Sequence, residues 1–153
     1  MNNRIICCIV AAALGSMCLS CRQEVEKRVI SRYADNRPRV VREYVTVGDT
    51  SILHKEIHFF PGEKKYIEKN FNDSGKPDGV WVSWYENGNK NSEGTYRNGR
   101  WHGTYRVWHP NGKLFYTGEY ANGRRTGIWK YYDSTGVLVR TEDCTAPISG
   151  QQY

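Results

Sequence analysis

A repeat of 24 residues is the feature that most restricts how this chain can fold. Residues 79–102 and 103–126 agree at nine of 24 positions, and residues 127–150 begin in the same way before they diverge. The shared positions are Gly79/Gly103, Trp84/Trp108, Asn87/Asn111, Gly88/Gly112, Gly94/Gly118, Tyr96/Tyr120, Asn98/Asn122, Gly99/Gly123 and Arg100/Arg124. Such a period is typical of arrays in which each unit packs only against its neighbours. We therefore expect a repeat array rather than one large globular core, with a degenerate unit upstream of residue 79.

Each unit carries two turn signals. Asn87-Gly88 and Asn98-Gly99 mark the first unit, and the same dipeptides return 24 residues later. We expect a type I turn closed by a left-handed glycine at both ends of the unit, because glycine tolerates positive φ. The segments between turns are rich in Trp, Tyr, Val and Thr, which favours strands. Strands are predicted over 39–47, 51–60, 64–71, 79–85, 90–97, 103–108, 113–120, 127–132 and 137–142.

Large aromatic residues recur as pairs spaced three apart. The six members are Trp81, Trp84, Tyr105, Trp108, Trp129 and Tyr132. A regular strand places such pairs on opposite faces, so either the strand is bulged or the sheet carries aromatic side chains on both faces. Gly94 and Gly118 are expected to leave room for a neighbouring ring. The six residues form either the core of a thin sheet or, where exposed, the candidate surface for a protein partner.

The first 20 residues have the pattern of an export signal. Arg4 precedes an uncharged run of 15 residues, shorter than the roughly 20 that a membrane-spanning helix needs. The following Ser20-Cys21 resembles the lipobox of bacterial lipoproteins, in which the Cys is acylated. We predict a helical signal peptide over 1–20, lipid attachment at Cys21 and a location in the cell envelope, with the outer membrane as the expected anchor. The alternative is an uncleaved N-terminal helix.

The remaining segments, the cysteines and the net charge do not indicate a reactive site. Residues 21–38 are charged and lack glycine, which suits a tether; residues 39–144 form the predicted repeat domain, and residues 145–153 a polar tail. After the signal and the anchor, Cys144 is the one cysteine left, which argues against a disulfide framework and a Cys-rich metal site. The net charge is +6, but export removes nucleic acid as the obvious partner.

Candidate reactive residues are few. His54, Glu56 and His58 share one face of an extended strand, yet no motif supplies further metal ligands, so a solvated strand face is favoured. His102 and His109 occupy repeat positions that other units fill with unrelated residues, which indicates structural tolerance. We predict no catalytic residue, no metal and no cofactor.

The pattern G-x-W-x-x-W-Y-x-N-G…G-x-Y-x-N-G-R-x-x-G resembles the MORN-repeat variant family, named for the membrane occupation and recognition nexus. The resemblance covers about residues 54–142. It implies an all-β fold, an elongated antiparallel meander of β-hairpins, and it transfers no catalytic residue. Many bacterial members are lipoproteins or exported proteins, often labelled as antitoxins of toxin–antitoxin systems. Residues 54–78 lack the Trp pair and Cys144 replaces the repeat tyrosine, as expected of end caps.

Together these observations predict a non-catalytic, lipid-anchored envelope protein whose array is a protein-binding or scaffolding surface. Two alternatives stay open: an antitoxin or immunity-type protein that neutralises a toxin, and a phospholipid-binding module. The expected partners are an envelope protein or a toxin, and the membrane through Cys21.

Overall fold

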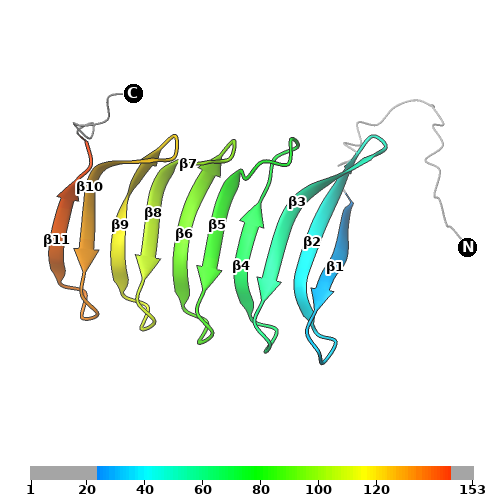
Figure 1. Cartoon of the computed structure of the whole chain (residues 1–153), viewed down its shortest axis with the longest axis horizontal. Coiled ribbons are helices and arrows are strands. Elements are labelled where there is room, and N and C mark those ends of the chain that lie inside the picture. The colour runs from blue at the N-terminus through cyan, green and yellow to red at the C-terminus, as the bar shows by residue number, and fades with distance from the viewer. Residues whose placement is uncertain (1–23, 146–153) are drawn as a thin grey trace, which may run out of the picture.

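The computed structural model describes residues 24–145, in which all regular structure is β-strand (Figure 1). The strands are β1 (Val25–Arg32), β2 (Pro38–Val47), β3 (Thr50–Phe59), β4 (Lys65–Asn70), β5 (Gly79–Trp84), β6 (Lys90–Arg97), β7 (Arg100–Trp101), β8 (Gly103–Trp108), β9 (Leu114–Ala121), β10 (Arg124–Tyr132) and β11 (Leu138–Asp143). The predicted signal helix, the lipid attachment at Cys21 and the tail from residue 146 lie outside the described residues. Within residues 24–145 there is no helix long and apolar enough to cross a membrane.

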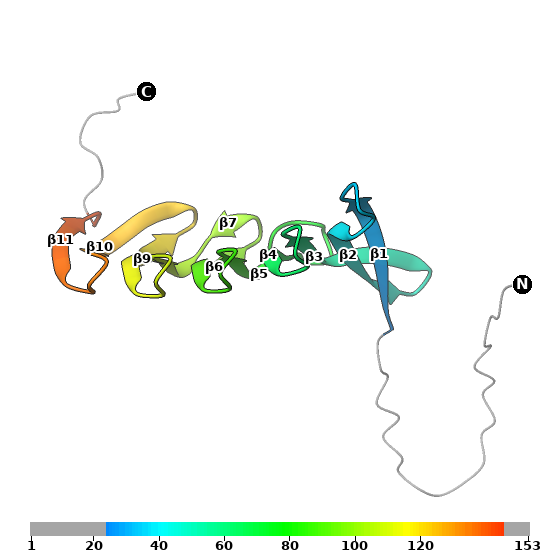
Figure 2. The ribbon, with the colours of Figure 1, turned by 90° about the horizontal axis from the view of Figure 1, so that it is seen from below.

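All eleven strands belong to one antiparallel sheet, in which neighbours in space follow the order of the chain. The short β7 pairs with β6 beside the main path, and β8 continues that pairing. The hairpins follow one another along the long axis of the molecule as a single layer (Figures 1 and 2). The predicted all-β meander of hairpins is therefore confirmed.

Every predicted strand has an observed counterpart whose bounds differ by at most three residues, but two strands were missed. The tether predicted over residues 21–38 is wrong for β1, which pairs with β2 in the register Val25↔Val45. The charged residues of β1 are matched across the pair, since Lys27 binds Glu43 at 2.9 Å. A charged strand can lie at the edge of a sheet, where such residues stay hydrated.

Five turns at one end of the sheet share the same backbone hydrogen bonds. In each, the N–H of the first residue donates to the carbonyl four residues later, and its carbonyl accepts the N–H three residues later. The first residues are Tyr33, Phe60, Tyr85, His109 and Asp133. The fourth residues, all with positive φ, are Asn36, Glu63, Gly88, Gly112 and Gly136. The array thus has five hairpins, and the first escaped prediction because its turn, residues 33–37, contains no glycine.

At the opposite end, the turn that begins at Asn72 has the same hydrogen bonds as the five, but the two Asn-Gly turns differ from the prediction. Asn98 and Gly99 both have positive φ, at 50° and 84°, and Asn122 and Gly123 repeat them at 51° and 85°. Two positive φ values define a type I′ turn rather than a type I turn closed by glycine. The I′ form follows because a two-residue loop must match the right-handed twist of its strands.

The second strand of every hairpin contains one extra residue. The pairing advances by one residue on the first strand and by two on the second, which leaves the extra residue without a partner in the register. The five extra residues are Arg39, Tyr66, Asn91, Phe115 and Val139. A bulge bends and twists its strand, so its repetition curls the sheet in the same way in each hairpin.

Candidate functional site

One face of the sheet carries the first aromatic residue of each repeat. Trp81 pairs with Gly94 and Tyr105 with Gly118. A Cβ atom at Gly94 would lie 2.5 Å from Tyr105 Cδ2, and one at Gly118 would lie 2.1 Å from Trp129 Cδ2. The ring of the next hairpin therefore lies directly over each glycine, which confirms the prediction that these glycines make room for neighbouring rings.

The rings on this face form a continuous series, here called the aromatic row. Consecutive ring centroids are 3.8–6.3 Å apart. In spatial order the members are Phe71, Trp81, Tyr96, Trp101, Tyr105, Tyr120, Trp129, Tyr116 and Tyr131. Three of the nine belong to the six aromatic residues predicted to bind a partner. The recurrence of Tyr96 as Tyr120 was a usable signal, whereas Trp101 stands in the loop-side strand β7 and has no equivalent in the next repeat.

The aromatic row is part core and part surface. Trp129 is 2% exposed, and the Arg125 guanidinium carbon lies 4.0 Å above its ring centroid. The other rings of the row are partly exposed. A single-layered sheet has no second layer to cover them among residues 24–145, so neighbouring rings shield one another instead. Burial raises the pKa of the Tyr116 hydroxyl to about 12, helped by the nearby tyrosines.

The second aromatic residue of each repeat lies on the opposite face. The register shifts between Ser83 and Trp84 because β6, not β5, contains an extra residue. The side chains of β5 therefore alternate regularly, and Trp84 lies on the opposite face from Trp81. The ring of Trp84 lies 5.8 Å from Lys65 Nζ, and the ring of Trp108 lies 5.7 Å from Lys90 Nζ. The sheet therefore carries aromatic side chains on both faces. Of the six predicted partner-binding residues, Trp81, Tyr105 and Trp129 belong to the aromatic row and Trp84, Trp108 and Tyr132 do not.

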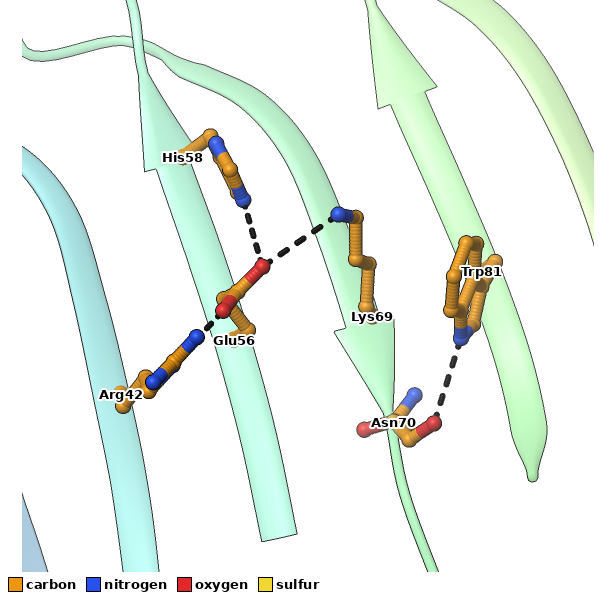
Figure 3. A network of polar contacts seen from close by, with 6 residues as sticks. All are labelled: Arg42, Glu56, His58, Lys69, Asn70 and Trp81. Atoms are coloured by element: carbon orange, nitrogen blue, oxygen red, sulfur yellow. Dashed lines mark hydrogen bonds and ion pairs between the residues drawn. The ribbon is translucent and has the colours of Figure 1, made fainter. Parts of the chain in front are cut away.

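A charged cluster adjoins the row at the end nearer the N-terminus, and Figure 3 shows it. Glu56 on β3 accepts hydrogen bonds from Arg42 Nε at 2.7 Å and Lys69 Nζ at 3.3 Å, and it contacts His58 Nε2 at 2.7 Å. We call these four residues the Glu56 cluster. Lys69 Nζ also lies 5.3 Å from the ring centroid of Trp81, which links the cluster to the row.

Glu56 is 8% exposed, so the charge of its carboxylate depends on its partners. Burial by itself raises its pKa, but the hydrogen bonds from His58, Arg42 and Lys69 outweigh burial and hold the pKa at about 2. We predicted that this face of the strand is solvated, and the prediction is wrong at Glu56, which is buried. His54 is exposed and is the extra residue of the bulge between β2 and β3. The part of the chain that the structure describes contains no group of three His, Cys, Asp or Glu side chains able to hold a metal ion.

A second cluster, the Glu142 cluster, closes the other end of the row. Arg125 donates to both oxygens of Glu142, at 3.1 and 3.0 Å, and the Tyr131 hydroxyl donates to Oε2 at 2.9 Å. Arg140 Nη1 lies 3.4 Å from the same oxygen. These contacts, led by the bond from Arg125, lower the pKa of Glu142. They also fix Arg125 over the buried ring of Trp129.

His109 connects two neighbouring turns of the array. His109 Nε2 lies 3.0 Å from the carbonyl oxygen of Tyr132 in the next hairpin. Tyr85 makes the same connection one repeat earlier, because its hydroxyl donates to the carbonyl of Trp108 at 2.7 Å. Each bond joins one turn to the following turn, and Tyr33 makes a third such bond, whereas Phe60 and Asp133 at the same position do not.

Comparison with known protein families identifies the repeated unit. A family model described as the MORN repeat variant matches residues 77–98, 101–122 and 125–142. The three matches coincide with the last three hairpins, and the first two hairpins lie outside them although they share the same turn geometry. No curated protein matches the chain.

Proposed function

We propose that this chain, a MORN-repeat protein by its three consecutive repeats within residues 77–142, is a non-catalytic module that binds another protein through its aromatic row. MORN repeats are in general protein-binding or membrane-binding modules and not enzymes. The finer assignment to a protein partner is ours and rests on the chemistry of the row.

The observation that carries the proposal is the partial exposure of the row. Eight of its nine rings keep some surface open to solvent, although Trp and Tyr side chains of this size normally gather in a core. Aromatic residues that lie side by side at a surface are typical of the centre of a protein interface, where they supply most of the binding energy. The row offers them on a framework of paired strands, so little conformational entropy remains to be lost on binding.

The charges at the two ends of the row indicate the kind of partner. Lys69 borders the row at Trp81, and Arg125 and Arg140 border it at Trp129 and Tyr131. Each cluster places more than one cationic group around a single carboxylate. A partner with an apolar centre and acidic flanks is therefore complementary to this face.

We also propose that the module acts at the cell envelope, anchored by a lipid on Cys21. The support is the apolar run of 15 residues that ends in Ser20-Cys21. Mass measurement of the intact chain from cells tests this step, because acylation adds a defined mass that a Cys21→Ala variant lacks. An unmodified Cys21 would refute the anchor and leave the binding module untouched.

The binding proposal is tested by crosslinking in intact cells, with capture of the native chain and of two sets of variants. Trp101→Ala and Tyr105→Ala remove partly exposed rings of the row, and Trp84→Ala and Trp108→Ala remove comparable rings of the opposite face as matched controls. We expect the first set to lose the captured partner and the second set to keep it, with circular dichroism unchanged in both. Loss of the partner only in the control set would move the binding surface to the opposite face. A captured toxin would assign the module to immunity, and an envelope protein would assign it to scaffolding.

Binding to lipid is the competing outcome. If the row variants bind anionic vesicles as the native chain does, and no protein is captured, the proposal of a protein partner fails. Adsorption that disappears as the salt concentration rises would then indicate attraction of the basic chain to the membrane surface.

A further inference from the structure

The last strand, β11, exposes one edge of the sheet. One side of β11 pairs with β10, and no strand among residues 24–145 pairs with the other. The Cys144 N–H donates to the Gly127 carbonyl at 2.9 Å, which shows that Cys144 faces β10. Backbone groups alternate in direction along a strand, so Glu142 and Arg140 also face β10. The N–H and C=O groups of Thr141 and Asp143 consequently point outward, free to accept another strand.

The last turn offers no side-chain hydrogen bond to a hairpin beyond β11, a feature it shares with the turn at Phe60, after which the array does continue. Within the array, Tyr33, Tyr85 and His109 each connect to a carbonyl of the following hairpin. Asp133 holds the equivalent position in the last hairpin, but a carboxylate cannot donate a hydrogen bond. Its Oδ1 instead accepts the N–H groups of Thr135 and Val137 inside its own turn. A further hairpin stacked in register, such as β1 of another copy, would find no donor there.

A second copy of β11 related by a two-fold axis carries its own turn at the other end of the sheet and needs no contact from the Asp133 turn, and the charges of β11 suit such a copy. Consider β11 paired antiparallel with its own copy, with outward-facing residues opposite one another. Centring the pair on Arg140 or on Glu142 sets like charges directly opposite, which is unfavourable. Centring the pair on Thr141 places Arg140 of each copy opposite Glu142 of the other copy, which gives two pairs of unlike charges. Both side chains are partly exposed, at 56% and 36%, so each pair across the axis would add a charge from the second copy to the Glu142 cluster.

From these contacts we propose that two copies of this chain associate through β11, paired antiparallel about a two-fold axis at Thr141. The contact is closed, because the same strand is used by both copies and no edge of β11 is left for a third. Residues directly opposite in an antiparallel pair share a face, so both aromatic rows lie on the same side of one continuous sheet. The dimer would double the surface of the proposed binding face, although its formation does not depend on that function.

The test is the mass of the full-length chain in detergent micelles, measured by sedimentation over a range of protein concentrations. We expect a monomer–dimer equilibrium. Thr141→Pro removes the outward N–H of both copies at an edge position that tolerates proline, and the loss of two hydrogen bonds should weaken the dimer by at least about tenfold. Thr141→Val keeps the N–H and the strand propensity, and serves as the matched control that still dimerises.

Charge variants test the register independently. Arg140→Glu sets two carboxylates opposite one another and should also weaken the dimer, whereas the double variant Arg140→Glu with Glu142→Arg restores unlike pairs and should recover it. Near-ultraviolet circular dichroism of the buried Trp129 reports whether each variant is folded. A monomer at every concentration, a dimer that Thr141→Pro leaves intact, or growth to open-ended oligomers would overturn the proposal. A monomer would indicate that the edge is covered by another part of the chain, and open-ended growth that β11 meets β1.

Discussion

Substitution of Gly118 by Ala should destabilise the sheet through a single steric conflict. The new Cβ would lie 2.1 Å from Trp129 Cδ2 and 2.3 Å from Cε2, far inside the roughly 3.5 Å at which carbon atoms attract one another. Gly118 does not have positive φ, so alanine suits its backbone and the effect is one of packing alone. Trp129 cannot lift away freely, because it is 2% exposed and lies beneath Arg125.

The size of the effect can be bracketed. Overpacking of a tight site costs about 1–3 kcal/mol. Complete displacement of the indole sets a ceiling of about 3–5 kcal/mol, the cost of truncating a buried Trp. We expect the free energy of unfolding to fall by about 3 kcal/mol, measured by urea titration with far-ultraviolet circular dichroism as the signal.

Gly62→Ala is the matched control. No heavy atom lies within 4 Å of its Cβ position, and its φ is not positive. Alanine there restricts the unfolded chain and should leave stability unchanged or raise it by up to about 1 kcal/mol. A Trp129→Leu background, which removes the indole from above Gly118, should reduce the cost of Gly118→Ala. If Gly118→Ala unfolds at the same urea concentration as Gly62→Ala, the conclusion that Gly118 makes room for the ring of Trp129 is refuted.

Three further outcomes follow from other contacts. Because the pKa of Glu56 is lowered to about 2 from 4.5, its contribution to stability is fully present above pH 4.5 and is lost as the pH falls through 2; Glu56→Gln should therefore destabilise the chain at neutral pH, on the order of 3 kcal/mol, and the difference from native should vanish in urea titrations toward pH 2. Tyr85→Phe removes the 2.7 Å bond to the Trp108 carbonyl and should lower stability by about 1 kcal/mol, whereas an unchanged urea midpoint would show that this turn contact contributes nothing. The Tyr116 pKa of about 12 means that its stabilising effect is complete below pH 10 and is lost as the pH rises through 12; Tyr116→Phe should remove the last tyrosinate step from an ultraviolet titration, and persistence of that step would assign it to another tyrosine.

The position of most strands could be predicted because the signals for them are local. Asn87-Gly88 and its repeat counterparts specify turns through the φ values that only a few residues tolerate. The prediction failed at the first hairpin, where Asn36 takes the left-handed conformation that glycine takes at the same position of the last three turns. Asp35 offered a weaker signal, since its side chain accepts the Arg37 N–H as Asn87 accepts that of Asn89.

The two charged clusters could not be predicted from spacing. Arg42, Glu56 and Lys69 lie on three different strands, and only the registers of β2 with β3 and β3 with β4 bring them opposite one another. A shift of one residue in either register would turn the carboxylate to the other face. The predicted grouping of Glu56 with His54 used the distance along one strand, whereas the partners that neutralise its charge come from the strands on both sides.

The sequence by itself determined the class of fold, the repeat and the places where the chain turns, because each depends on residues close together in the chain. Only the tertiary structure decided what the aromatic residues do. The pair spaced three apart could occupy one face or two, and the answer depended on which strand of the hairpin carries the bulge. Since the bulge lies on the second strand, Trp81 enters the aromatic row and Trp84 leaves it. The same cross-strand registers brought Trp101 and the repeat tyrosines between the tryptophans, and so made a continuous row from residues that no local pattern connects.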